Sequence, residues 1–340
     1  MKKLLNTLYI TDENAYLTLD GENIAVKLSD NRIARFPFAN LESIICFSYL
    51  GCSPALMGKC CEEGISLSFL SPYGGFLARV QGKARGNVLL RKTQIEKFSG
   101  PDITLARNTV AVKLANTAFT VSRSLRDHPE IDNDGAVSAL LCKLKNSVEE
   151  AYSQNNKTEL LGLEGNCAKA YFGIYDRMIV KQHDDFSLNM RTKRPPLDRT
   201  NALLSFMYSI LTSDYASALE SVGLDSYVGF YHELRPGRCS LACDLVEETR
   251  CIVDRFVLTL INLRQVNAND FERQSTGAVL LNNDGRKKVL TLWQEKKRTT
   301  VIHPYLKQKI QLGLIPFIQS NLLAKYIRNE LTEYPAYIQK

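Results

Sequence analysis

The sequence predicts an α+β protein in which a small N-terminal β-rich domain precedes a larger, mainly α-helical domain. Three observations predict this fold: a length of 340 residues, short β-rich runs up to about residue 80, and helical periodicity from about residue 84. A chain of this length accommodates two domains. We place the β-rich domain at residues 1–82 and the helical domain at residues 83–340.

The first 80 residues consist of short β-rich runs separated by turn residues. The runs cover residues 4–10, 15–19, 23–28, 32–38, 43–47, 65–70 and 76–80. The dipeptide Asp20-Gly21 predicts a hairpin between the second and third runs. Ser53 followed by Pro54 predicts the start of a short helix, because serine caps helix N-termini and proline fits the first turn. Gly64 predicts its end.

Beyond residue 84 the hydrophobic pattern changes to a helical period. Long stretches without closely spaced glycine or proline cover residues 105–126, 136–154 and 159–180. Loops are indicated at residues 128–135, 191–196 and 235–238, where proline, glycine and polar residues gather. The second domain is therefore expected to be helical.

Composition excludes several classes of protein. Hydrophobic residues make up 45% and charged residues 23%, which is typical of globular proteins rather than disordered or fibrous ones. No stretch approaches the roughly 20 apolar residues of a membrane-spanning helix, and polar residues follow the first leucines too soon for a signal peptide. We expect a cytoplasmic protein with no membrane partner. The nine cysteines form no C-x-x-C pair, which predicts buried, reduced thiols.

The positive charge is unevenly distributed along the chain. Residues 1–80 hold 7 basic and 8 acidic residues, whereas residues 81–340 hold 36 and 28. Basic residues cluster at 83–85, 91–92, 191–194, 235–238, 286–288 and 296–298. A single cluster of this kind is usually a solvated surface, but several in one part of the chain favour a polyanionic partner such as nucleic acid.

Glu164 does not fit a purely structural interpretation of the segment 159–180. On a helical wheel it lies near the centre of an apolar stripe that includes Leu160, Leu161, Cys167 and Tyr171. A carboxylate on a buried face needs a compensating partner. One explanation is a salt bridge to a buried Arg or Lys, and the other is a metal ligand or catalytic acid.

A second unusual segment runs from residue 229 to residue 261. Ser240 is a plausible N-cap for a helix to about Ile261. On its wheel Asp244 and Glu248 lie together at the edge of the apolar stripe, whereas Glu247 points further round. His232 precedes this helix in a short loop that can fold back over the helix start.

Together, Glu164, His232 and Asp244 predict a carboxylate–imidazole site suited to Mg²⁺ or Mn²⁺, with Glu248 as an outer-shell acid. The adjacent Arg235 and Arg238 are suited to hold phosphate. The residues alone therefore suggest metal-dependent phosphodiester chemistry on nucleic acid.

Four ordered blocks of the sequence resemble the CRISPR-associated spacer-acquisition integrase family. The blocks cover residues 162–172, 191–208, 232–250 and 271–288. The family combines a small β domain with a larger helical catalytic domain. The resemblance implies that the metal ligands and catalytic residues are Glu164, His232 and Asp244. Cys239 and Cys243 depart from the residues expected in the third block, which changes packing and leaves this ligand set intact.

The resemblance also implies an activity and partners. Family members are homodimers that flank a dimer of a small ferredoxin-like protein, bind a double-stranded DNA fragment, and join its 3′-hydroxyl to a phosphodiester at the CRISPR repeat. We expect DNA contacts from Arg191, Lys193, Arg194, Arg235 and Arg238. The nearly neutral N-terminal domain, with strand edges that need covering, is the expected dimerisation domain. A hydrolytic metal-dependent DNA nuclease and a non-catalytic DNA-binding scaffold are the alternatives.

Overall fold

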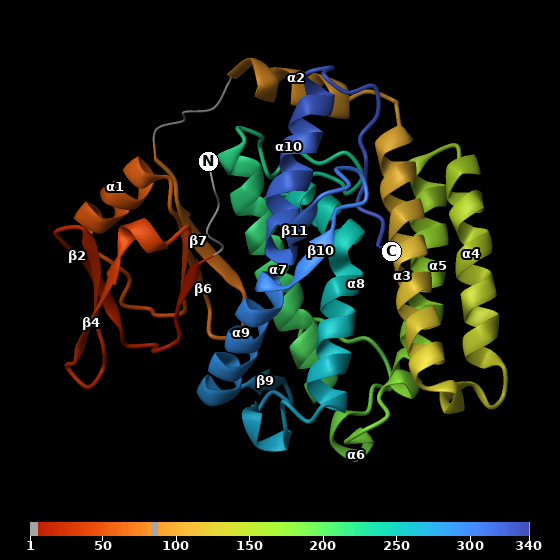
Figure 1. Cartoon of the computed structure of the whole chain (residues 1–340), viewed down its shortest axis with the longest axis horizontal. Helices are drawn as coiled ribbons and strands as arrows, with labels where there is room; N and C mark the ends of the chain where they lie inside the picture. Colours follow the sequence, from red (N-terminus) through yellow and green to blue (C-terminus); the bar gives the residue numbers. More distant parts are fainter. Residues whose placement is uncertain (1–5, 83–87, 340) are drawn as a thin grey trace.

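The computed structural model describes residues 6–82 and 88–339. The start of the first expected strand, residues 4–5, and the basic pair Lys83 and Arg85 lie outside these residues. Figure 1 shows a small β-rich region, coloured red to orange, beside a larger helical body. This arrangement confirms the α+β fold class.

Within the described residues, the N-terminal region contains two sheets and one α-helix. Its elements are β1 (Thr7–Ile10), β2 (Tyr16–Asp20), β3 (Asn23–Lys27), β4 (Ile33–Pro37), β5 (Ser43–Cys46), α1 (Pro54–Glu63), β6 (Ser66–Leu70) and β7 (Phe76–Val80). One sheet has the order β1-β5-β6-β7, with β1, β5 and β6 parallel and β7 antiparallel. The other is the antiparallel β2-β3-β4.

Local signals in this region behave as the sequence predicts. The β2–β3 hairpin turns at Gly21, whose φ of +57° suits a residue without a side chain. The Ser53 hydroxyl accepts a hydrogen bond from the Leu56 N–H at 3.3 Å and so caps α1, and Pro54 is its first residue. Gly64 ends α1 in the left-handed conformation.

The helical body consists of nine described α-helices and two short hairpins. The helices are α2 (Val88–Phe98), α3 (Thr104–Asp127), α4 (Ala136–Ser153), α5 (Lys157–Tyr175), α6 (His183–Phe186), α7 (Arg199–Ser221), α8 (Ser240–Asn262), α9 (Asn283–Arg298) and α10 (Ile315–Ile327). The hairpins are β8 (Phe271–Arg273) with β9 (Val279–Leu281), and β10 (Thr300–Ile302) with β11 (Lys309–Gln311). Strands of three residues are too short to leave an alternating pattern in a sequence.

Helix α8 lies at the centre of the body. It packs against α3 on one side and against α7 on the other (Figure 1). As a result, 17 of its 23 residues are buried, including Asp244 and Glu248. None of the described helices combines the length and the apolarity that a bilayer crossing requires.

The β-rich region is packed firmly against the helical body. Ile45, Phe47 and Leu70 belong to the hydrophobic core of the body rather than to the smaller core of the sheets. Arg79 on β7 forms an ion pair of 3.0 Å with Glu220 on α7. The two regions therefore share an interface that is built like a protein interior.

Three local predictions are wrong. The expected helix 159–180 ends at Tyr175, because the Asp176 carboxylate accepts a hydrogen bond from the Leu188 N–H at 2.7 Å and draws the chain into a turn. Leu161, expected on the buried stripe, is 39% exposed. The N-cap of α8 is Cys239 rather than Ser240, whose hydroxyl donates to the Glu233 carbonyl at 3.1 Å and closes the preceding loop.

All nine cysteines are free thiols, but they are not all buried. Cys142 is exposed, because the buried residues of α4 are Val137, Leu140, Leu144, Ser147 and Ala151 and Cys142 lies on the opposite face. Cys61, Cys239 and Cys243 are partly exposed.

Candidate metal and DNA site

Asp244 holds the loop that carries His232. This carboxylate is fully buried in the first turns of α8 and accepts hydrogen bonds from the backbone N–H groups of Phe230, Tyr231 and His232 at 2.7, 3.0 and 2.9 Å. Its Oδ1 also lies 2.7 Å from His232 Nδ1. A side chain at Gly229 would place a Cβ atom 2.7 Å from Asp244 Oδ2, so this close approach requires glycine.

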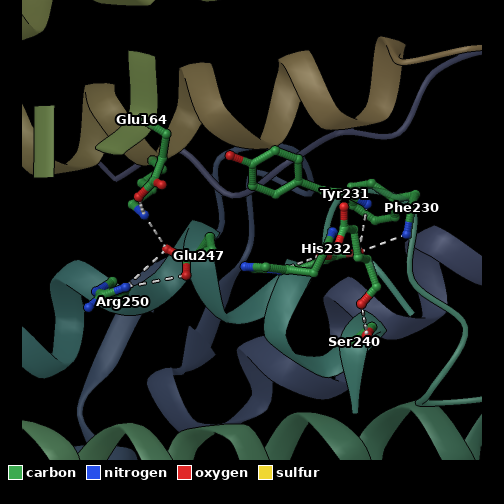
Figure 2. Close-up of polar contacts among 10 residues, drawn as sticks. Glu164, Phe230, Tyr231, His232, Ser240, Glu247 and Arg250 are labelled. Carbon is green, nitrogen blue, oxygen red and sulfur yellow. Dashed lines mark hydrogen bonds and ion pairs between the residues drawn. The ribbon is translucent and has the colours of Figure 1, made fainter. Parts of the chain in front are cut away.

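The bond from Nδ1 fixes the orientation of the His232 ring and leaves its Nε2 free for another partner. Figure 2 shows the ring extending from its loop toward Glu247 on α8. The charge of His232 is one of the influences that lower the pKa of Glu247, which agrees with their proximity.

Lys113 connects the carboxylates of Glu164 and Glu247. Its ammonium group on α3 is paired with Glu164 on α5 and lies 2.6 Å from Glu247 Oε2 on α8. Arg250, one turn further along α8, lies 3.3 Å from both carboxylate oxygens of Glu247. Figure 2 shows Glu164 and Glu247 facing each other from the two helices. The compensating cation expected for Glu164 is thus Lys113.

The electrostatics at Glu247 favour its charged form. Burial alone would raise the pKa of Glu247, but the nearby charges of Lys113 and Arg250 lower it well below its usual value. Glu247 is therefore ionised at neutral pH. It was not among the expected site residues.

These residues supply donors of the right chemical type for a hard divalent cation. Carboxylate oxygens and a neutral imidazole nitrogen are ligands that Mg²⁺ and Mn²⁺ accept. Among residues 6–82 and 88–339, no three His, Cys, Asp or Glu side chains are already assembled as a metal-binding group. Instead, the Lys113 ammonium provides the positive charge between Glu164 and Glu247. The donor set fits a divalent cation, which would replace the Lys113 ammonium as the positive charge between Glu164 and Glu247.

Glu248 lies in a different network on the other side of α8. Its Oε2 accepts hydrogen bonds from Gln319 Nε2 at 2.9 Å, the Tyr334 hydroxyl at 3.1 Å and the Tyr337 N–H at 2.9 Å. Burial raises the pKa of Glu248 to about 7, against the lowering effect of these hydrogen bonds. It contacts the C-terminal segment rather than the His232 loop, so the structure does not place it as an outer-shell acid.

The wheel places Glu247 further round than Asp244 and Glu248, but the Glu247 side chain is only 11% exposed and pairs with Lys113. A wheel with one apolar stripe assumes that the remaining faces meet solvent, but α8 is covered on nearly all sides. One available signal was the position of Glu247 three residues after Asp244, which places both on one face. A second was Lys113, a lone charge within the apolar stretch 110–114.

Four of the five expected DNA-binding residues line one cavity of about 820 Å³. Lys193 and Arg194 come from the loop after α6, and Arg235 and Arg238 from the loop before α8. The remaining wall comes from the β6–β7 turn and α7, including the apolar side chain of Phe206. Cys243, one turn before Glu247 in α8, also lines the cavity.

Arg191, the fifth expected DNA-binding residue, is engaged inside the protein. Its guanidinium donates to Asn201 Oδ1 at 2.7 Å and to Ser205 Oγ at 3.0 Å, and lies 5.6 Å from the centre of the Tyr208 ring. These contacts hold the loop 191–196 against α7. The structure thus shows a structural role for Arg191, and its expected contact with DNA phosphate stays a prediction.

Two other basic clusters also contain buried members. Arg286 donates to the Pro72 carbonyl at 2.7 Å and to Glu13 at 2.8 Å, and so ties α9 to the N-terminal region. Lys297 is buried beside Asp214 at 3.7 Å. Counting basic clusters in the sequence therefore overstates the cationic surface.

The chain matches a known protein family over most of its length. Residues 8–295 match the model of the family described as CRISPR associated protein Cas1. The chain is 40% identical over 341 residues to the CRISPR-associated endonuclease Cas1 1 of Chlorobaculum tepidum, with 99% of both chains covered.

Two solved structures have a similar fold. A casposase bound to integration product superimposes with a TM-score of 0.82 at 23% identity, covering 96% of this chain and 92% of that one. A chain of a Cas6-RT-Cas1–Cas2 complex gives a TM-score of 0.80 at 20% identity, covering 98% of this chain and 36% of that one.

Proposed function

Since this chain belongs to the Cas1 family of CRISPR-associated proteins, we propose that it is a metal-dependent DNA endonuclease and integrase of CRISPR adaptation. The reaction is the joining of a DNA 3′-hydroxyl to a phosphodiester at the CRISPR repeat. The observation that carries the proposal is the pairing of Glu164 and Glu247 with the Lys113 ammonium, with the His232 ring directed toward Glu247.

In this proposal the metal is held by Glu164, Glu247 and His232 Nε2. Asp244 is a positioning residue, because its oxygens already accept four hydrogen bonds from the His232 loop. It orients the imidazole and selects the tautomer with a free Nε2. Glu247 thus replaces Asp244 in the ligand set suggested by the sequence.

A bound Mg²⁺ or Mn²⁺ supplies Lewis-acid polarisation of a phosphate oxygen and favours the alkoxide form of the attacking hydroxyl. The new bond forms between the 3′-oxygen and phosphorus, and the bond to the 3′-oxygen of the target strand breaks. The attacking hydroxyl loses its proton and the leaving oxygen takes one up. The charges of Lys113 and Arg250 lower the pKa of Glu247 and so favour its ionised form.

The DNA is proposed to follow the cationic cavity. Arg235, whose side chain is 69% exposed, and Arg238 stand at the loop that leads into α8, with Lys193 and Arg194 across the cavity. Guanidinium groups hold phosphates by paired hydrogen bonds. A duplex fragment held here brings its end to His232 and Glu247.

The activity is tested with a short DNA duplex, a plasmid carrying a CRISPR repeat, the small ferredoxin-like partner protein, and Mg²⁺ or Mn²⁺. We expect strand-transfer products that disappear when a chelator is added or when the duplex ends in a 3′-dideoxynucleotide. Nicking that persists with the dideoxy duplex would instead identify a hydrolytic nuclease. DNA binding without either product, equal with and without chelator, would identify a scaffold.

We further propose that residues 1–82 form a homodimerisation domain and that residues 83–340 bind metal and DNA. Strand β4 is an edge strand, and its Ile33 is 53% exposed, so a second copy could cover it. We expect Ile33→Glu to convert a dimer to a monomer in light scattering. Leu263→Glu, at an exposed position of the helical body, is the control. An unchanged dimer would place the interface elsewhere.

A further inference from the structure

The hydroxyl of Tyr231 is buried without a partner. Tyr231 is 2% exposed, and its hydroxyl finds no hydrogen-bond partner in the part of the chain that the structure describes. Other buried tyrosines of this body do have partners: the Tyr175 hydroxyl donates to the Asp254 carbonyl at 2.9 Å, and Tyr334 donates to Glu248 at 3.1 Å. An unpaired buried hydroxyl costs free energy, so it calls for a ligand from outside the chain.

This hydroxyl lies at the candidate metal site. Tyr231 precedes His232, and the two rings are 5.1 Å apart between centroids. Its backbone N–H is fixed by Asp244 at 3.0 Å, so the residue is anchored by the same carboxylate that orients His232. Figure 2 shows the ring directed into the site, with the hydroxyl on the side where Glu164 lies.

The Tyr231 hydroxyl is chemically able to donate a hydrogen bond to an oxygen of a ligand. The two carboxylates nearest to it are already paired with Lys113.

We propose that the Tyr231 hydroxyl donates a hydrogen bond to a non-bridging oxygen of the DNA phosphodiester that reacts between Glu164, His232 and Glu247. Tyr231 is then a further catalytic residue, and this inference rests on the proposed function. The non-bridging oxygens carry the negative charge of the phosphoryl group in the transition state. A fixed donor in a site from which water is excluded stabilises that charge without having to reorganise.

The test is Tyr231→Phe, which removes the hydroxyl and keeps the ring. We expect the rate of strand transfer at saturating DNA to fall roughly 10- to 100-fold, toward the effect of removing one oxyanion donor. The affinity for DNA and the melting temperature should stay the same or rise, because an unpaired hydroxyl has been removed. Tyr227→Phe, at an exposed position of the same loop, is the matched control and should keep the wild-type rate.

A sulfur substitution separates catalysis from packing. We compare the two phosphorothioate diastereomers at the reacting phosphate, each with wild type and with Tyr231→Phe. If Tyr231 donates to one non-bridging oxygen, sulfur at that oxygen slows the wild type and has a clearly smaller effect on Tyr231→Phe. Equal sulfur effects on both proteins for both diastereomers would overturn the proposal.

The outcomes also distinguish this inference from the function on which it rests. An active wild type with an equally active Tyr231→Phe overturns the role of Tyr231 and leaves the proposed function intact. A wild type with neither strand transfer nor cleavage overturns the proposed function and this inference with it.

Discussion

Glu247 and Glu248 are neighbours in the chain, but they belong to different parts of the structure. Glu247 is on the side of α8 that faces α3 and α5, where Lys113 and Arg250 pair with it. Glu248 is on the side that faces α10 and the C-terminal segment, where Gln319 and Tyr334 donate to it. Burial acts on both, yet the pKa of Glu247 is lowered and that of Glu248 is raised to about 7.

The difference shows that burial alone does not decide whether an acid is charged. The charge of a buried acid depends on the groups that bond to its carboxylate. Cations such as Lys113 and Arg250 surround Glu247, whereas neutral groups such as Gln319 and Tyr334 surround Glu248. An ammonium between two carboxylates marks a place where the protein stabilises positive charge, and a divalent cation can take over this role. A neutral network around a carboxyl group holds chain segments together instead.

The largest expected effect separates the two acids directly. Glu247→Gln should lower strand transfer by at least about 100-fold, since a lost metal ligand removes several kcal/mol of transition-state stabilisation. Glu248→Gln should remain within roughly threefold of the wild-type rate, because no transition-state contact is removed. Initial rates with a labelled duplex measure both. Equal losses in the two variants would contradict the assignment.

A second prediction distinguishes ligand from positioning residue. Asp244→Asn should weaken Mn²⁺ binding by roughly 10- to 100-fold, the usual cost of losing the partner of a metal-bound histidine. It should also lower the melting temperature. The NH2 group of the asparagine side chain cannot accept the hydrogen bonds that the Phe230 and Tyr231 N–H groups donate to Asp244. Titration with Mn²⁺ followed by electron paramagnetic resonance measures the affinity. Glu247→Gln is the comparison and should lose binding at least as severely. If Asp244→Asn bound Mn²⁺ like the wild type, His232 would not depend on it.

A third prediction concerns the cationic cavity on the Glu247 side. Replacing Arg235 and Arg238 together by Gln should weaken DNA binding and reduce the slope of log K against log salt by about 0.9 for each phosphate that is no longer neutralised. Arg191→Gln should lower the melting temperature instead, since this side chain holds Asn201 and Ser205. Fluorescence anisotropy at several salt concentrations measures the slopes. An unchanged slope in the double variant would assign both arginines to structure.

The smallest expected effect tests the neutral network behind Glu248. His303 is buried there and bonds Gln319 at 3.0 Å, and burial lowers its pKa from 6.5. The His303 imidazole therefore takes up a proton more readily in the unfolded chain than in the folded protein. The free energy of unfolding should fall as the pH drops below about 6.5. His303→Asn should be less stable overall but lose less on acidification. Melting temperatures between about pH 8 and 5 test this, with His128→Asn, whose side chain is 40% exposed, as the control. Parallel pH profiles for wild type and His303→Asn would refute it.

Local sequence was sufficient to predict the features that depend on neighbouring residues. The hairpin at Gly21, the cap at Ser53 and most helix positions follow from local backbone preferences and the hydrophobic period, and the structure confirms them. Glu164 and His232 also stood out locally, one as a charge on an apolar stripe and the other as a histidine before a buried helix.

Long-range packing, by contrast, establishes which acid of α8 faces Glu164 and which basic residues remain at the surface. Lys113 meets Glu164 across 51 positions of sequence, and the bonds of Arg286 reach Pro72 and Glu13 in the N-terminal region. No local pattern encodes such pairings. In a helix that is covered on nearly every side, the apolar stripe no longer indicates which face is buried. The contacts of each side chain then depend on the segments that pack against its face.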